Sequence, residues 1–306
     1  MATNGSDPSN DHRKPRAKRA IVQPETIRLL IACPDARGII ASVANFIADH
    51  GGNILEADQH SELHHGEFFM RIEIERGGFS LDDRTFDKAW EAVADRYRMR
   101  WRIDWGVSRK RMAILVSREE HCLNDLLWRR QTGEIDVELP LVASNHETLR
   151  DVVESFGIAY HHLPITPKTK MQQERQLAEL LDKHAIDFLV LARYMQILSP
   201  GFVGRYPQGI INIHHSFLPA FAGSKPYHQA FDRGVKVIGA TSHYVTDQLD
   251  AGPIIAQRVT NVDHRDTIGD LIRKGRDLER MVLATAVRQH AEDRILVSKN
   301  KTVVFE

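Results

Sequence analysis

An asparagine and a histidine stand two positions apart at the end of an apolar segment, residues 210–214. The pair is Asn212 and His214, and Ser216 and Pro219 follow shortly after. In an extended strand, alternate residues point to the same face, so both side chains face one way. Their N–H groups are suited to holding a carbonyl oxygen as it gains negative charge. An isolated asparagine at a strand end is explained by backbone binding, but its pairing with His214 before a turn favours a chemical role.

A carboxylate follows about 36 residues later, in a second polar stretch. Asp250 precedes Gly252, Pro253 and another apolar run, 254–256. A carboxylate at such a position can take or relay a proton. A turn aspartate before Gly-Pro is the alternative, and on spacing alone that alternative is favoured.

The elements that must position these residues alternate between short buried strands and amphipathic helices. This pattern predicts a mostly parallel sheet with helices on both faces. Ligands of such sheets bind at the carboxyl ends of the strands. The predicted strands are 112–116, 137–142, 159–162, 188–192, 210–214 and 237–245; the predicted helices are 123–130, 149–156 and 177–184. A long helix or a helix pair is predicted for residues 267–293. A terminal hairpin is predicted for residues 295–297 and 302–305.

The preceding block has a different layout. Apolar residues at helical spacing fall in 39–47 and 86–97, and strands are expected at 27–32, 53–60, 67–75 and 99–103. The order β-α-β-β-α-β over about 80 residues is the ferredoxin-like layout. Arg98, Arg100 and Arg102 alternate along the last strand, where either an anion site or a solvated outer face explains them.

Length and composition support two domains and exclude some functions. The chain has 306 residues, and domains contain roughly 150 residues each. We predict a disordered arm at 1–23, a small domain at 24–105 and a catalytic domain at 106–306. Lys plus Arg equals Asp plus Glu, at 41 each, which argues against a nucleic-acid partner. No apolar run approaches the roughly 20 residues of a membrane span. The 2 cysteines are too few for a disulfide scaffold, so we expect a cytoplasmic protein.

Common cofactor and metal motifs are absent from the sequence. It contains no G-x-G-x-x-G, Walker A, G-x-S-x-G, H-E-x-x-H or C-x-x-C pattern. The adjacent histidine pairs 64–65, 161–162 and 214–215 suit one metal ion poorly, because neighbouring side chains on a strand point to opposite faces. We expect no metal. Cys122 offers a thiol without an assigned base, so a packed thiol is favoured over a nucleophile.

The spacing of Asn212, His214 and Asp250, with the segment 216–219, resembles the formyltransferase fold of enzymes that use 10-formyltetrahydrofolate. The segments 222–230, 234–241 and 252–257 are similar to its formyltetrahydrofolate deformylase branch. The resemblance covers roughly residues 111–306. Residues 24–105 resemble an ACT domain, a small module that senses amino acids, and an ACT domain ahead of this fold also matches the deformylase branch.

The resemblance implies a role for each matching residue. Asn212 and His214 match the residues that polarise the formyl oxygen, and Asp250 matches the carboxylate that manages the proton and orders water. Thr241 matches a supporting hydroxyl residue near that carboxylate. The remaining matches line the folate pocket: Arg193, Met195, Gln196, Ile197 and Leu198. Gln196 departs from a basic residue common there in the transformylase.

One departure favours water as the acceptor. After the first strand, the transformylase has a glycine-containing turn that holds the phosphate of its substrate. Here that place, residues 117–124, lacks a glycine-rich cradle and carries Glu119 and Glu120, which would repel phosphate. The implied reaction is hydrolysis of 10-formyltetrahydrofolate to tetrahydrofolate and formate, which feeds purine synthesis and balances one-carbon pools. Formyl transfer to a small amine and a non-catalytic sensor are the alternatives.

The resemblance also implies partners. The substrates are a folate and water, with no further cofactor. A regulatory small amino acid is expected at the ACT domain, where Asp35 and Arg37 either help to bind it or cap the following helix. ACT modules often pair edge to edge, so we expect a homo-oligomer.

Overall fold

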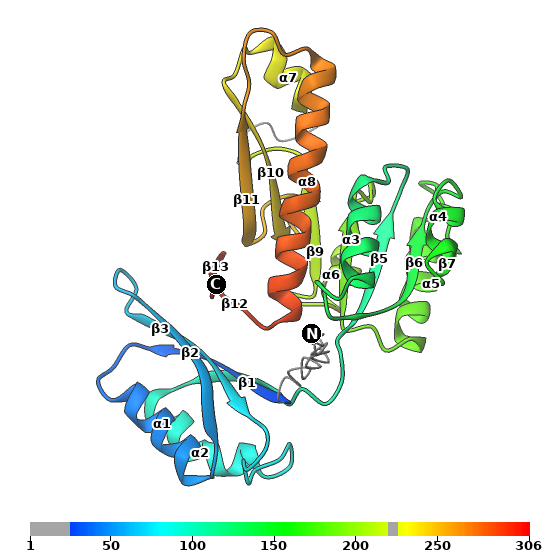
Figure 1. Cartoon of the computed structure of the whole chain (residues 1–306). Coiled ribbons are helices and arrows are strands. Elements are labelled where there is room, and N and C mark those ends of the chain that lie inside the picture. The colour runs from blue at the N-terminus through cyan, green and yellow to red at the C-terminus, as the bar shows by residue number, and fades with distance from the viewer. Residues whose placement is uncertain (1–24, 220–225) are drawn as a thin grey trace, which may run out of the picture.

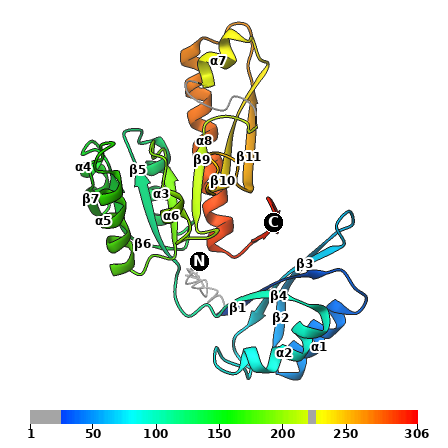
Figure 2. The same ribbon diagram turned by 180° about the vertical axis from the view of Figure 1, so that it is seen from behind.

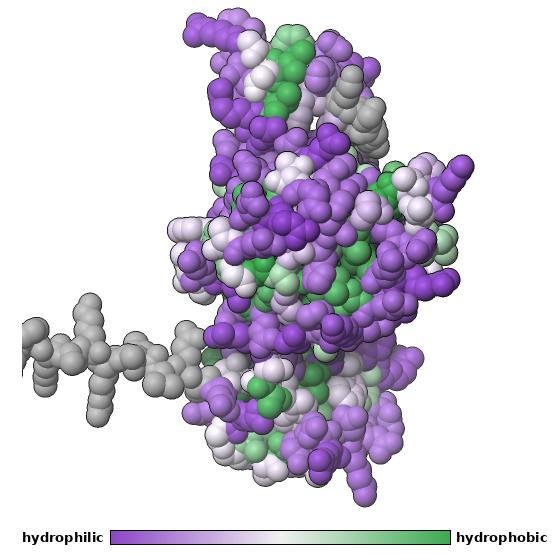
Figure 3. Space-filling view, turned by 90° about the vertical axis from the view of Figure 1, so that its right-hand side faces the viewer, coloured by the Kyte–Doolittle hydropathy of each residue, from purple (hydrophilic) through white to green (hydrophobic). Residues whose placement is uncertain are grey.

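The structure is a computed structural model that describes residues 25–219 and 226–306. It contains two sheets with helices, which lie one above the other (Figure 1), and a C-terminal hairpin. The predicted arm at 1–23 and the stretch 222–225 of the quoted segment 222–230 lie outside the described residues. The face in Figure 3 is mostly hydrophilic, with small separate apolar areas. None of the helices in the described part of the chain combines the length and the apolar character that crossing a membrane requires.

The small domain confirms the ferredoxin-like layout. Its four antiparallel strands have the order β2-β3-β1-β4. Its elements are β1 (Thr26–Pro34), α1 (Ile39–Asp49), β2 (Asn53–Glu62), β3 (Glu67–Glu75), α2 (Phe86–Tyr97) and β4 (Arg100–Asp104). The helices bury Phe46, Phe86 and Trp90 against one sheet face. In both views the helices lie on the side away from the large domain, so the other sheet face is turned toward it (Figures 1 and 2).

The expectation that Asp35 or Arg37 caps α1 is not met. Gly38 occupies the N-cap position in the left-handed conformation, with φ at 89°. A Cβ at Gly38 would lie 3.2 Å from the Tyr97 hydroxyl, which explains why a glycine stands there. Asp35 and Arg37 are both exposed.

The large domain confirms the mostly parallel sheet with helices on both faces. The seven strands have the order β11-β10-β9-β8-β5-β6-β7, and all pairings are parallel except the two that β10 makes with β9 and β11. The strands are β5 (Arg111–Val116), β6 (Glu138–Ser144), β7 (Ala159–His162), β8 (Phe188–Ala192), β9 (Ile210–His214), β10 (Val237–Tyr244) and β11 (Ile254–Asn261). The helices are α3 (His121–Gln131), α4 (Arg150–Ser155), α5 (Lys170–Lys183), α6 (Pro200–Val203), α7 (Pro226–Asp232) and α8 (Ile268–Ala291).

The structure decides between two alternatives for the C-terminal region, and two other details differ from the sequence-based expectation. The C-terminal region is one continuous helix, α8, whose start is fixed by a capping box between Thr267 and Asp270. Helix α5 begins at Lys170, earlier than its apolar pattern indicated. Strand β11 was not predicted as a strand, because it lies at the sheet edge and its second half is polar and largely exposed.

The C-terminal hairpin ties the two domains together. It consists of β12 (Ile295–Ser298) and β13 (Lys301–Val304) and follows α8 directly. Phe305 packs with Ala32 and Phe69 from the outer face of the small sheet. The structure thus contains the predicted hairpin, which covers a part of the outer face of the small sheet that would otherwise be exposed.

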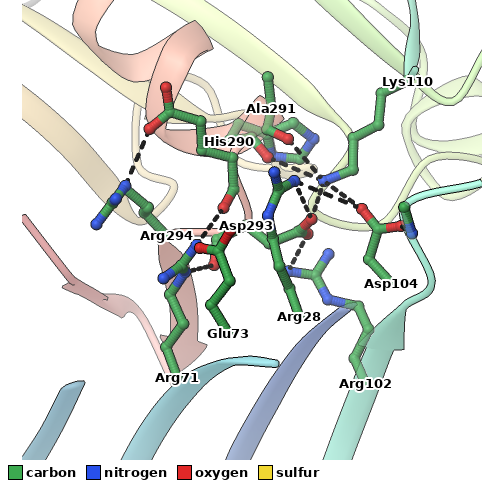
Figure 4. A network of polar contacts seen from close by, with 12 residues as sticks. Arg28, Arg71, Glu73, Arg102, Asp104, Lys110, His290, Ala291, Asp293 and Arg294 are labelled. Carbon is green, nitrogen blue, oxygen red and sulfur yellow. Dashed lines mark hydrogen bonds and ion pairs between the residues drawn. The ribbon is translucent and has the colours of Figure 1, made fainter. Parts of the chain in front are cut away.

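A buried ion cluster joins the end of α8 to the small sheet (Figure 4). Asp293 is only 1% exposed, and its carboxylate lies 2.5 Å from Lys110 Nζ and 3.1 Å from Arg102 Nη2. Arg71, equally buried, donates to the backbone oxygens of Asp293 and Glu292 and so places a cation at the C-terminal end of the helix. Of the two explanations for Arg102, the structure shows contact with an anion, which is Asp293 of this chain.

His290 lies beside this cluster near the end of α8. Its ring packs on Phe188 with centroids 4.6 Å apart, and its Nδ1 and the Tyr244 hydroxyl share a hydrogen bond of 2.8 Å. Burial, followed by the nearby charges of Lys110 and Arg102, lowers the pKa of His290 to about 3. His290 is therefore neutral in the folded protein at ordinary pH.

This neutral histidine should make the protein less stable in mild acid. The unfolded chain binds a proton at His290 near the ordinary pKa of 6.5, whereas the folded protein excludes it down to about pH 3. Stability that is present above pH 6.5 is therefore lost as the pH falls, by about 2 kcal/mol between pH 7 and pH 5.

Urea unfolding at both pH values measures this loss. His290→Gln should remove this part of the pH dependence, and His264→Gln, at an exposed histidine, should retain it. An equal pH dependence in all three proteins would assign the effect to another group.

Candidate active site

The order of the strands places a crevice at the carboxyl ends of β5 and β8. The chain extends from β5 through β6 to β7 and then crosses back to form β8 on the other side of β5. Such a reversal of strand order is where ligands bind in open α/β sheets. The Ser117 hydroxyl, just after β5, accepts a hydrogen bond from the Met195 backbone N–H at 3.1 Å and joins the two loops.

A pocket of about 330 Å³ lies at this end of the sheet. The segment 193–198 after β8 forms one side, the loop 245–250 after β10 forms the other, and Asn212 and His214 of β9 lie between them. Met195 (57% exposed), Ile197 (61%) and Leu249 (67%) are large apolar side chains left open beside the pocket. The predicted segment 193–198, which includes Gln196 and Leu198, therefore lines the same pocket as the Asn212–His214 pair.

His214 and Asp250 are in direct contact. His214 Nδ1 lies 3.2 Å from Asp250 Oδ2, although the two residues are 36 positions apart. Asp250 has φ at 54°, a left-handed conformation that turns its carboxylate back toward β9. The hydrogen bond from His214 holds the pKa of Asp250 well below its usual range. Asp250 is therefore ionised at neutral pH.

The second ring nitrogen of His214 remains for a ligand. His214 is 5% exposed, and its Nε2 has no hydrogen-bond partner among the described residues. Buried polar atoms usually have a hydrogen-bond partner, and a nitrogen beside a pocket that has none among the described residues is available to a bound ligand. With Nδ1 facing an anionic carboxylate, a protonated ring can donate from Nε2 to a substrate oxygen.

His243 orients Asn212, and the sequence analysis assigned it no role. His243 Nδ1 donates to the Tyr244 carbonyl at 2.9 Å, so in the neutral ring Nε2 is an acceptor. The Asn212 amide nitrogen lies 3.2 Å from that Nε2 and can donate to it. An amide nitrogen carries two N–H groups, so the second can donate to a ligand. The usable signal was the spacing of His243 two residues after Thr241 on one strand, which places both on one face.

Thr241 supports the turn that follows His214. It pairs with His214 across β9 and β10, and it is fully buried. Its hydroxyl donates to the Ser216 carbonyl at 2.8 Å and accepts from the Leu218 backbone N–H at 3.0 Å and from the Gln257 amide at 2.9 Å. These bonds fix the backbone next to His214.

A second buried charged group lies behind the pocket. The Glu279 carboxylate, from α8, lies 2.9 Å from His121 Nε2, 2.7 Å from the Tyr227 hydroxyl and 3.5 Å from Arg193 Nε. Arg193 has φ at 62°, which is unusual for a long side chain. Burial, followed by the charge of Glu279, raises the pKa of the Cys122 thiol well above its usual range, consistent with a packed thiol.

Known proteins resemble the chain over nearly its whole length. The formyl transferase family model matches residues 110–287, and the ACT domain model matches residues 27–78. A formyltetrahydrofolate deformylase of Synechocystis sp. is 51% identical over 280 residues, 92% of this chain and 98% of that protein. The corresponding protein of Bacillus subtilis is 48% identical, over 91% of this chain and 93% of its own length.

Solved structures of these enzymes also resemble this chain. A formyltetrahydrofolate deformylase from Pseudomonas syringae has a TM-score of 0.90 and 51% identity, covering 94% of this chain and 96% of its own. A glycinamide ribonucleotide transformylase from Symbiobacterium toebii has a TM-score of 0.61 and 30% identity, covering 65% of this chain and 95% of its own.

Proposed function

This chain belongs to the formyltetrahydrofolate deformylase family, and we propose that Asn212, His214 and Asp250 carry out its reaction. The protein is a hydrolase that converts 10-formyltetrahydrofolate to tetrahydrofolate and formate. The observation that carries the residue assignment is the unpaired Nε2 of His214, which lies beside a pocket of about 330 Å³ on a ring whose Nδ1 contacts the ionised Asp250.

In this proposal the formyl oxygen lies between two donors. The Asn212 amide and the protonated His214 donate to it, and both bonds strengthen as water adds and the oxygen becomes an oxyanion. The carboxylate of Asp250 contacts Nδ1 of His214 at 3.2 Å and so holds the ring in place, which leaves Nε2 for the formyl oxygen. Side-chain N–H groups supply the whole stabilisation, so the proposal requires no cofactor or metal.

Asp250 also manages water. Its carboxylate accepts a hydrogen bond from the attacking water, whose oxygen bonds to the formyl carbon. Because the pKa of Asp250 is lowered, its carboxylate passes the proton to another group and does not remain protonated. The carbon–N10 bond then breaks, the proton reaches N10, and formate and tetrahydrofolate leave.

The apolar side of the pocket suits the folate rings. Met195, Ile197 and Leu249 offer exposed apolar area, and the segment 193–198 provides backbone groups at the pocket edge. Pockets for small organic ligands combine such apolar walls with a few placed polar groups.

Partners and location belong to the same proposal. We place the enzyme in the cytoplasm, where it supplies formate for purine synthesis and balances one-carbon pools. A small amino acid is proposed as a regulator at the ACT domain near the exposed Asp35 and Arg37, and a homo-oligomer is proposed through that domain.

The stoichiometry of the products tests the reaction type. Incubated with 10-formyltetrahydrofolate, the protein should release formate and tetrahydrofolate in equal amounts. Millimolar glycinamide ribonucleotide should leave the rate unchanged, because Glu119 and Glu120 stand where an anionic acceptor would be held. Formate and tetrahydrofolate are assayed separately, and formylated glycinamide ribonucleotide as the main product would identify a transferase instead.

A further inference from the structure

A second cleft, which shares no lining residue with the folate pocket, lies beside the residues that contact Glu279. It has a volume of about 740 Å³ and is lined by α3, α8 and the turn after β5, including Arg118, Glu119, Asn124 and Arg276. His121 belongs to its lining, whereas Arg193 belongs to the lining of the folate pocket. Both contact the same carboxylate, that of Glu279. One buried carboxylate therefore stands between two openings on the crevice.

Three side chains contact the Glu279 carboxylate. We call His121, Arg193, Tyr227 and Glu279 the Glu279 wall. The four residues come from four different parts of the chain: the start of α3, the end of β8, α7 and the middle of α8. Glu279 is 1% exposed, His121 has 13% of its side chain exposed and Arg193 15%. Burial alone would raise the pKa of Glu279, but the hydrogen bond from His121 and the charge of Arg193 outweigh it and lower the pKa.

Tyr227 completes the wall next to His215. Its ring lies 6.1 Å from the ring of His215, the neighbour of His214. A Cβ at Gly275 of α8 would lie 2.0 Å from the Tyr227 hydroxyl, so only a glycine lets the tyrosine approach this helix. Helix α7 is thereby held against α8, with its tyrosine directed at Glu279.

We propose that the Glu279 wall separates the formyl group from the second cleft, so that amines in that cleft cannot reach it and water is the acceptor. The proposal rests on the assignment of Asn212 and His214 as the formyl-binding pair. It makes His121, Tyr227 and Glu279 specificity-determining residues, since the catalytic groups themselves do not distinguish water from an amine.

If the Glu279 wall were removed, formyl transfer to an amine would compete with hydrolysis. An amine nitrogen would bond to the formyl carbon, the carbon–N10 bond would break, and the proton lost by the amine would end on N10. The products would be an N-formyl amine and tetrahydrofolate. Water, which is smaller, reaches the same carbon through the folate pocket, from the side of Asp250.

The test measures how product is divided between formate and a formylated amine. Wild type, His121→Ala and Tyr227→Ala are given 10-formyltetrahydrofolate with glycinamide as the amine probe. Both alanine variants should produce N-formylglycinamide at least about tenfold above wild type, rising with glycinamide concentration at the expense of formate. Tyr227→Phe is the matched control: it keeps the ring, loses the hydroxyl, and should still yield formate alone.

Two outcomes would overturn the proposal. One is formate as the only product of folded His121→Ala and Tyr227→Ala at every glycinamide concentration. The other is loss of all turnover in folded His121→Ala, since a partition is not needed for hydrolysis. If Tyr227→Ala does not fold, the products of His121→Ala test the proposal. The His121 side chain lies at the edge of the second cleft, so its removal disturbs less packing.

The design separates this proposal from the assignment of the catalytic residues. The product ratio is measured with Asn212, His214 and Asp250 intact, so it does not depend on their individual roles. Adding Asn212→Ala to Tyr227→Ala should suppress both products together. Unchanged turnover in that double variant would refute the role of Asn212 while the product ratio still reports on the wall.

Discussion

Replacing Asn212 by alanine should lower kcat by about 100- to 1000-fold, the usual cost of removing one donor to an oxyanion. His214→Ala and Asp250→Ala should each abolish most turnover as well. In the proposed mechanism His214 supplies the second donor, and Asp250, which contacts His214 at 3.2 Å, orders the attacking water. All three line a pocket and lie outside the apolar core, so the loss should fall on rate and leave folding largely intact.

Formate release and thermal melting, measured on the same preparations, test this prediction. Asp247→Ala is the control for Asp250, because Asp247 is an exposed carboxylate in the same loop and should affect KM at most. Asp250→Asn separates charge from shape: it keeps a side chain of the same size but cannot stabilise a protonated His214. Near-normal kcat in any of the three alanine variants would remove that residue from the mechanism.

Asp293→Ala should produce the largest loss of stability, about 3–5 kcal/mol in the free energy of unfolding. Asp293 is 1% exposed and balances Lys110 at 2.5 Å and Arg102 at 3.1 Å. Its loss leaves Arg102 without its ion-pair partner and leaves Lys110 with only the more distant Asp104, at 3.8 Å, where α8 meets the small sheet. A buried charge whose partner is removed costs far more than an exposed pair contributes.

Urea unfolding at pH 7 measures this effect against a matched exposed pair. Asp182 forms an ion pair with Arg205 at 2.7 Å, and its side chain is 60% exposed. Asp182→Ala should cost less than about 1 kcal/mol. Asp293→Asn should lie between the two, since it keeps the shape and loses the charge. An Asp293→Ala variant as stable as Asp182→Ala would show that the cluster does not hold the domains together.

The sequence alone determined the elements and the first half of the site. Periodicity predicted both sheets, most helices and the C-terminal hairpin, because burial of one face imposes a repeat on consecutive residues. The same local logic placed Asn212 and His214 on one face of β9, where they lie in the structure. Local pattern failed at β11, an edge strand with little buried area, and at the early turns of α5, which carry polar residues.

Only the tertiary structure decided which distant residues meet. From its spacing alone, Asp250 was predicted only as a turn residue. In the structure its left-handed backbone brings its carboxylate to His214. His243 acquires its role from the antiparallel pairing of β10 with β9, and Glu279 from the packing of α8 on α3 and α7. Arg102 has its partner only because α8 ends against the small sheet. The hydrophobic repeat along the chain shows which face of each helix or strand is buried. Contacts between residues far apart in the sequence depend instead on how whole helices and strands pack together. That packing is determined by the entire sequence and not by any local pattern.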